Sequence, residues 1–155
     1  MPEITTVAVA LHALAAALWV GGMFFAHQVL RPTLGFLEPP QRLALWNKVF
    51  ARFFPWVWVA VIVLPLTGYT QVFLDYGSFD AAGRHVEIMH GLGWLMIALF
   101  LFLIAVPYRR FKTAVAGETW KEAAGHLAVI RRIVGTNLIL GLLTIAIGAS
   151  GRFWE

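Results

Sequence analysis

Histidine is the residue type in this sequence that is best suited to do chemistry. The chain has five of them, which are His12, His27, His85, His90 and His126. A neutral imidazole binds haem iron or copper through one ring nitrogen, and it needs a bonding partner wherever it lies among apolar residues. The sequence has no cysteine, which excludes disulfides, thiolate metal sites and cysteine nucleophiles. The candidate chemistry is therefore metal or haem binding by imidazole.

The spacing of four histidines predicts two levels of ligands along a helical bundle. His12 and His27 are 15 residues apart, which in an α-helix is roughly 22 Å of rise and about 60° of rotation, so both face broadly the same side. We expect His90 at the depth of His12, and His126 near the depth of His27. Haem iron takes two axial ligands on opposite faces. The pattern therefore predicts haem b, as one group or two, with these histidines as axial candidates.

Small and aromatic residues accompany the histidines at helical spacing. Trp19 and Gly22 lie on the same helical face as His12, where a flat macrocycle needs room. A stripe in the last apolar run consists of Asn137, Gly141, Thr144 and Gly148. We include Trp19, Gly22 and Asn137 among the candidate cofactor-binding residues. The alternative is close helix packing, with Asn137 as an interhelical hydrogen-bonding residue.

A second possible metal site consists of His85, Met89 and His90. They lie at positions i, i+4 and i+5, so His85 and Met89 can share a helix face. Copper(I) favours methionine and histidine ligands. This cluster predicts a weak copper site as the alternative to haem, and His85 otherwise reads as a loop residue.

Composition identifies the elements that must position these residues. The chain of 155 residues is 60% apolar and 13% charged, whereas soluble domains are about half apolar and a quarter charged. So short a chain cannot bury that much apolar surface in water. A spanning helix needs about 20 apolar residues. Four runs meet this length, at about residues 4–30, 55–74, 86–106 and 126–150. We therefore predict an all-α membrane protein, a single four-transmembrane-helix bundle.

The connections between these runs predict the orientation. All lysines and arginines except Arg84 and Arg152 fall in or beside the first and third connections, so the positive-inside rule places those connections in the cytoplasm. Both termini then lie on the outer, periplasmic side of a bacterial inner membrane. The same distribution argues against nucleic acid as a partner, although the net charge is +4. Residues 39–46 predict a separate, proline-started helix at the membrane interface, and Pro65 predicts a kink.

The opening helix resembles two known families. The stretch Leu11–Pro32 reads LHALAAALWVGGMFFAHQVLRP, in which His12 is followed by the Trp-x-Gly-Gly of residues 19–22. This pattern resembles the opening helix of CopD-type copper-resistance membrane proteins, and it is similar to that of HemJ-type protoporphyrinogen oxidases. The pair Thr67-Gly68 and the cluster Tyr108-Arg109-Arg110 fit the same resemblance.

The two families imply different functions. HemJ-type enzymes imply a b-type haem in a four-helix bundle, with His12 as a ligand, and oxidation of a porphyrinogen. Their Trp-Leu-His-x-Lys motif is absent here, because the corresponding stretch reads His90-Gly91-Leu92-Gly93-Trp94, without a lysine. The CopD resemblance implies copper handling.

The leading functional hypothesis is an integral membrane b-type haem protein with a redox or electron-transfer role, which would make a haem-dependent oxidoreductase. Its donor or acceptor could be a quinone or another redox protein, and no catalytic residue is identified. The alternatives are copper transport or copper resistance, a HemJ-like oxidase, and a non-catalytic membrane subunit. The lipid bilayer is the expected surrounding, and the glycine and alanine stripes could also serve a homodimer.

Overall fold

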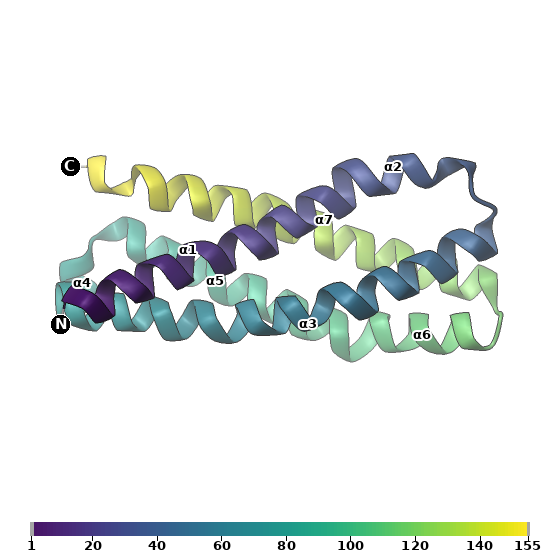
Figure 1. Ribbon diagram of the computed structural model, residues 1–155, viewed down its shortest axis with the longest axis horizontal. Helices are drawn as coiled ribbons and strands as arrows, with labels where there is room; N and C mark the ends of the chain where they lie inside the picture. Colours follow the sequence, from purple (N-terminus) through teal and green to yellow (C-terminus); the bar gives the residue numbers. More distant parts are fainter. Residues whose placement is uncertain (1, 155) are drawn as a thin grey trace.

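The computed structural model describes residues 2–154, and these residues form helices and no strand (Figure 1). Four continuous helical spans are long and apolar enough to cross a membrane, which confirms the predicted all-α four-helix membrane fold. In the described part of the chain the spans are Glu3–Phe36, Pro39–Tyr76, Arg84–Ala116 and Trp120–Ser150, called spans 1 to 4 below.

The spans form an elongated bundle with both chain ends together (Figure 1). In it, α1 (Pro2–Phe24) packs against α3 (Pro39–Gln71), α5 (Arg84–Leu103) packs against α7 (Trp120–Ser150), and α1 also contacts α7. The end with both termini and α4 (Phe79–Ala82) is called the termini end. The opposite end, with α2 (Arg31–Thr33) and α6 (Arg109–Ala116), is called the basic end.

The second span begins earlier than the hydropathy suggests. Residues 39–46 do form a proline-started helix, but α3 continues from Pro39 without a break, and neither Pro55 nor Pro65 ends it. Leu43, Trp46 and Phe50 are all buried on one helical face. Because that face packs on the bundle, the predicted proline-started helix is the first part of α3 and is not a helix of its own.

The first and third spans also pass their prolines. Span 1 passes through a π-helical stretch, Phe25–Leu30, into α2, and span 3 passes through another, Ile104–Tyr108, into α6. Pro107 lies within the second stretch, and a local π-helical adjustment is one way in which a membrane helix gives partners to backbone groups that a proline leaves unbonded. Beyond it, Phe111 is fully buried against the bundle, so packing holds the extension in place. Span 4 begins at Trp120, six residues before the predicted start of the fourth apolar run at residue 126.

The core toward the basic end is built from aromatic rings. Phe50 and Phe54 stack with ring centroids 5.0 Å apart, and Tyr108 meets Phe54 edge-on at 4.8 Å. Phe111 closes the same group at 5.9 Å from Phe50. Such stacked and edge-to-face pairs fill space densely. This half of the bundle is therefore firmly packed.

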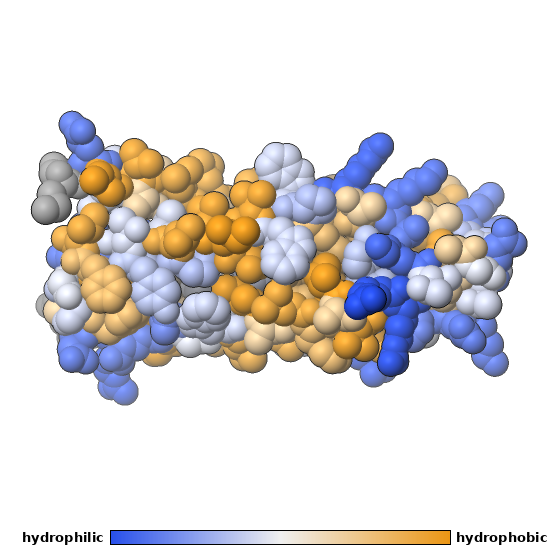
Figure 2. Space-filling model, turned by 90° about the horizontal axis from the view of Figure 1, so that it is seen from below, coloured by the Kyte–Doolittle hydropathy of each residue, from blue (hydrophilic) through white to orange (hydrophobic). Residues whose placement is uncertain are grey.

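The outer surface carries an apolar belt between two polar ends (Figure 2). Large apolar side chains are exposed along all four spans, for example Leu14, Ile62, Phe102 and Ile139. Such a continuous apolar surface would aggregate in water, whereas lipid tails solvate it. The chain is therefore a multi-pass membrane protein.

Close contact between the spans depends on Gly141 in α7. A Cβ atom there would lie 2.6 Å from a Val20 methyl carbon and 3.1 Å from the Met96 methyl carbon. We expect Gly141→Ala to lower the free energy of unfolding by about 1–3 kcal/mol through overpacking. Thermal unfolding in detergent micelles, followed by circular dichroism, measures the effect.

Gly125 in the same helix provides the matched control, because a Cβ there would meet nothing within 4 Å. Gly125→Ala should leave stability unchanged or raise it by roughly 0.5–1 kcal/mol, since alanine loses less backbone freedom on folding. Equal melting temperatures for the two variants would show that α7 is not held against α1 and α5 at Gly141.

Candidate functional site

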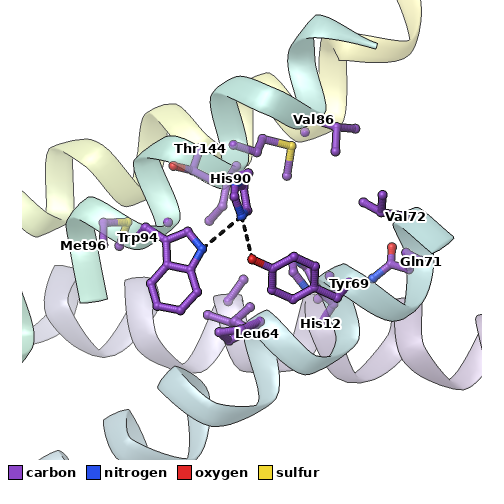
Figure 3. A pocket seen from close by; sticks show the side chains of 18 of the residues that line it. His12, Leu64, Tyr69, Gln71, Val72, Val86, His90, Trp94, Met96 and Thr144 are labelled. Atoms are coloured by element: carbon purple, nitrogen blue, oxygen red, sulfur yellow. Dashed lines mark hydrogen bonds between the residues drawn. The ribbon is translucent and has the colours of Figure 1, made fainter. Parts of the chain in front are cut away.

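A cavity of about 440 Å³ lies among the four spans toward the termini end (Figure 3). Its polar lining comes from α1, α3, α5 and α7, and the residues used below are His12, Tyr69, His85, Met89, His90 and Trp94. Among residues 2–154, no aspartate, glutamate, lysine or arginine lines it. The cavity is therefore an uncharged chamber with imidazole and thioether groups in its wall.

His12 enters the cavity from α1 and is fixed by Thr67 of α3. The His12 Nδ1 atom lies 2.8 Å from the Thr67 hydroxyl, which lies 2.7 Å from the Val63 carbonyl oxygen. In the tautomer with the proton on Nδ1, the His12 ring donates to the Thr67 hydroxyl, which donates in turn to the Val63 carbonyl. The remaining ring nitrogen, Nε2, then keeps its lone pair. Gly68 leaves room for the ring, because a Cβ there would lie 3.4 Å from Cε1 of His12.

His90 enters the same cavity from α5, beside Tyr69 of α3. The lone pair of its Nε2 atom already accepts hydrogen bonds. The Trp94 indole N–H donates to His90 Nε2 at 3.0 Å, and the Tyr69 hydroxyl lies 2.9 Å from the same atom (Figure 3). An indole can only donate, so Nε2 is an acceptor, and Tyr69 can bond to it only by donating as well. Two donors therefore converge on one nitrogen.

His85 and Met89 line the cavity near the C-terminal part of α7. The His85 ring packs on Gly151, where a Cβ would overlap the ring. The Met89 thioether packs on Gly148, where a Cβ would lie 3.1 Å from Sδ. Each glycine thus makes space for one potential copper ligand. Both side chains face the cavity that His12 also enters.

The other residues selected near His12 divide between the cavity and helix packing. Trp19 lines the cavity and is 3% exposed. Gly22 lies elsewhere, against the Phe53 ring in a separate groove between α1 and α3. Asn137 is buried, and its amide donates to the Met96 carbonyl at 3.1 Å. The structure thus gives Asn137 an interhelical contact outside the cavity lining.

His27 and His126 do not meet at the basic end. His27 lies against Gly135 of α7, where a Cβ would be 3.1 Å from Nε2. His126 lies nine residues earlier on α7, about 13 Å along the helix axis. The two imidazoles therefore occupy different heights in the bundle, and neither lines the cavity.

Two positioning residues are absent from the candidates that the sequence predicts. Thr67 contributes there only as part of the Thr67-Gly68 pair, and Tyr69 does not stand out. A signal for Thr67 exists in the sequence, because a threonine at the depth of a membrane histidine is a natural hydrogen-bond partner. No such signal exists for Tyr69, since its role depends on which helices are neighbours.

A haem with two imidazole ligands does not fit this arrangement. His12 has a free Nε2, whereas His90 Nε2 is taken by Tyr69 and Trp94. A bond from His90 to iron would require both donors to leave. Within the described residues, no three histidine, aspartate or glutamate side chains are grouped closely enough to hold a metal together either.

The fold and cavity define a four-span membrane protein with an uncharged, largely apolar cavity among its spans that a few imidazole, hydroxyl and thioether groups enter. A family model described as CopD, copper resistance protein D, matches residues 47–150. That is more than half of the chain, and the chain belongs to the CopD family. The match covers His85, Met89 and His90 but begins after His12, so the helix-one motif lies outside it.

Other comparisons add little about activity. A protein of Aquifex aeolicus (strain VF5), described as an uncharacterized protein, is 29% identical over 144 residues, which covers 92% of this chain and 91% of that protein. No solved structure matches the chain. The similarity to HemJ-type oxidases stays a prediction.

The Thr67 hydroxyl should be essential for the His12 position. We expect Thr67→Val to remove the hydroxyl that accepts from Nδ1–H of His12, with only the Leu64 backbone left as a partner of the ring, and to lower the free energy of unfolding by about 1–3 kcal/mol. In ¹⁵N-labelled protein, the imidazole signals of His12 should change from one tautomer to a mixture. Thermal unfolding in micelles and long-range ¹H–¹⁵N spectra measure these effects.

Thr70→Val is the matched control, because Thr70 donates only to the Leu66 carbonyl within its own helix. It should change stability less and leave the His12 signals in place. If both threonine variants behave alike, the Thr67 hydroxyl does not fix the His12 ring.

Proposed function

We propose that this protein handles copper in the membrane and binds Cu(I) in the cavity at the termini end. The observation that supports this most is the cavity lining of this CopD-family chain. Imidazole and thioether groups enter the cavity, and none of the described residues that line it is an aspartate, glutamate, lysine or arginine. In this proposal the copper ion is the cargo of the protein and not a resident cofactor.

The donor set favours Cu(I) over divalent ions. Thioether and imidazole are ligands that suit Cu(I), whereas magnesium, calcium and manganese prefer oxygen. A doubly charged ion in an apolar bundle needs carboxylates to offset its charge, and a singly charged ion needs fewer. Nε2 of His90 is engaged by Tyr69 and Trp94. The proposed donors are therefore three of the remaining imidazole and thioether groups of the lining, namely His12, His85 and Met89.

His90 has a different proposed role beside this site. With Trp94 and Tyr69 it forms a hydrogen-bonded trio on the cavity wall. Such a trio would hold the wall in shape and keep water away from a bound ion. His12 is then a copper ligand whose second ring nitrogen is hydrogen-bonded to Thr67. Such hydrogen-bond partners orient metal ligands and raise metal affinity.

The orientation proposed from the basic connections supports entry from outside. The positive-inside rule would put the termini end in the periplasm of a bacterial inner membrane. Copper arriving from that compartment would meet the cavity first.

Cu(I) binding by the purified protein tests the proposal. Titration in detergent against a chromophoric Cu(I) chelator, under reducing conditions, should give one Cu(I) per chain. His12→Ala and Met89→Leu should each weaken binding more than about ten-fold, since a lost ligand costs at least as much as a lost outer partner. Zn(II) should not compete at equal concentration. In a copper-sensitive host, expression should change copper tolerance, and His12→Ala should abolish that change.

His126→Ala and Met23→Leu are the matched controls, because they remove the same groups outside the cavity lining. Both should bind Cu(I) like the wild type. The proposal fails if His12→Ala and Met89→Leu bind normally. It also fails if the purified protein shows a haem absorption band that His12→Ala removes.

A further inference from the structure

A second polar cluster lies between α1 and α7 toward the basic end, away from the cavity. His27 packs on Gly135, with 3.1 Å between Nε2 and the position of a Cβ. Arg31 follows His27 by four residues, and Arg131 precedes Gly135 by four. The two helices run in opposite directions, so both arginines lie one turn nearer the basic end, next to each other. His27, Arg31, Arg131 and Arg42 of α3 are called the arginine cluster.

The cluster carries positive charge with no counter-charge. The charges of Arg31 and Arg131 both act on His27, and those of Arg31 and Arg42 act on Arg131. Arg42 and Arg131 are half-buried, so water screens them incompletely. Among residues 2–154, no carboxylate forms a salt bridge with any of the three arginines. Three like charges so close together repel, and the fold gains nothing visible in return.

Two polar atoms of the cluster are buried without a partner. They are Nδ1 of His27 and Nε of Arg131, neither of which bonds to any described atom. Buried polar groups in proteins are almost always hydrogen-bonded, so an orphan pair beside three cations indicates a missing acceptor. Arg131 Nε can only donate, so its missing partner is an acceptor. Beside three cations, an anionic group with several oxygens suits that place best.

We infer that the arginine cluster binds a phosphate group, such as that of an anionic phospholipid headgroup. Arginine matches phosphate oxygens through paired N–H donors, and basic residues at a helix end attract anionic lipids. Arg31 begins α2 at the basic end, where Figure 2 shows hydrophilic residues gathered beside the apolar belt. Headgroup phosphates occupy that level of a bilayer. Nothing in the proposed copper site depends on this second site.

Native mass spectrometry of the delipidated protein tests this inference. Phosphatidylglycerol, phosphatidylcholine and inorganic phosphate are added separately. We expect the wild type to retain one phosphatidylglycerol in preference to phosphatidylcholine. Arg31→Gln and Arg131→Gln should each weaken retention about five-fold, the factor for one basic residue at an anionic surface. Retention of inorganic phosphate as well would show that the site accepts both free phosphate and the phosphate of a lipid. Retention of phosphatidylglycerol alone would show that the ligand is the lipid headgroup.

Arg110→Gln is the matched control, because Arg110 is an exposed arginine of α6 at the same end. It should retain phosphatidylglycerol like the wild type. The Arg131→Lys variant keeps the charge but loses the paired donors, and it should fall between wild type and Arg131→Gln. Circular dichroism of each lipid-free variant checks that it is folded. Equal binding of both lipids, no binding of any probe, or equal losses in Arg110→Gln and Arg131→Gln would overturn the inference.

Discussion

Inside a bilayer, a polar side chain finds no water and must bond within the protein. The hydroxyl groups of Thr67, Thr70 and Thr144 each donate to the carbonyl four residues earlier. Asn137 donates to the backbone of a neighbouring helix. His12 reaches Thr67 of α3, and that one bond joins two spans and sets which ring nitrogen stays free. The constraint that satisfies the polar groups thus also prepares the single imidazole nitrogen that the cavity needs.

The two halves of the bundle are packed differently. Toward the basic end, aromatic rings fill the interior, from Phe50 to Phe111. Toward the termini end, Gly68, Gly141 and Gly148 remove side chains just where His12, Met96 and Met89 lie. Trp19 lines the cavity and also meets Phe100 edge-on at 6.2 Å. The chamber therefore ends where the aromatic core begins, which suits a binding chamber better than an open pore.

The four spans could be predicted because the hydropathy and charge of each residue follow directly from the sequence. The helix ends were harder to predict. The helix α3 starts at Pro39 and continues through Pro55 and Pro65, because burial of side chains such as Trp46 stabilises its first turns against the bundle. The matched depth of His12 and His90 could be inferred from helical rise alone. The partner Trp94 could be predicted from the sequence, because it lies four residues after His90 on the same helix. Tyr69 bonds to His90 from another helix. Which helices are neighbours cannot be predicted from local sequence. For that reason the haem hypothesis overvalued His90, whose nitrogen is already engaged.

The two polar regions also bear on each other through charge. His12 and His27 are separated by roughly 22 Å along α1, and at an effective dielectric constant of about 20 two unit charges at that distance interact by roughly 0.8 kcal/mol. The arginines lie about one turn farther away than His27 and salt screens their charges, so together they would destabilise a cation in the chamber by less than about 2 kcal/mol. A phosphate on the arginine cluster would cancel at least one of those charges. Neutral soft donors at one end and guanidinium groups at the other can therefore coexist in one bundle, and an anion on the arginine cluster would favour a cation in the chamber without being required for it.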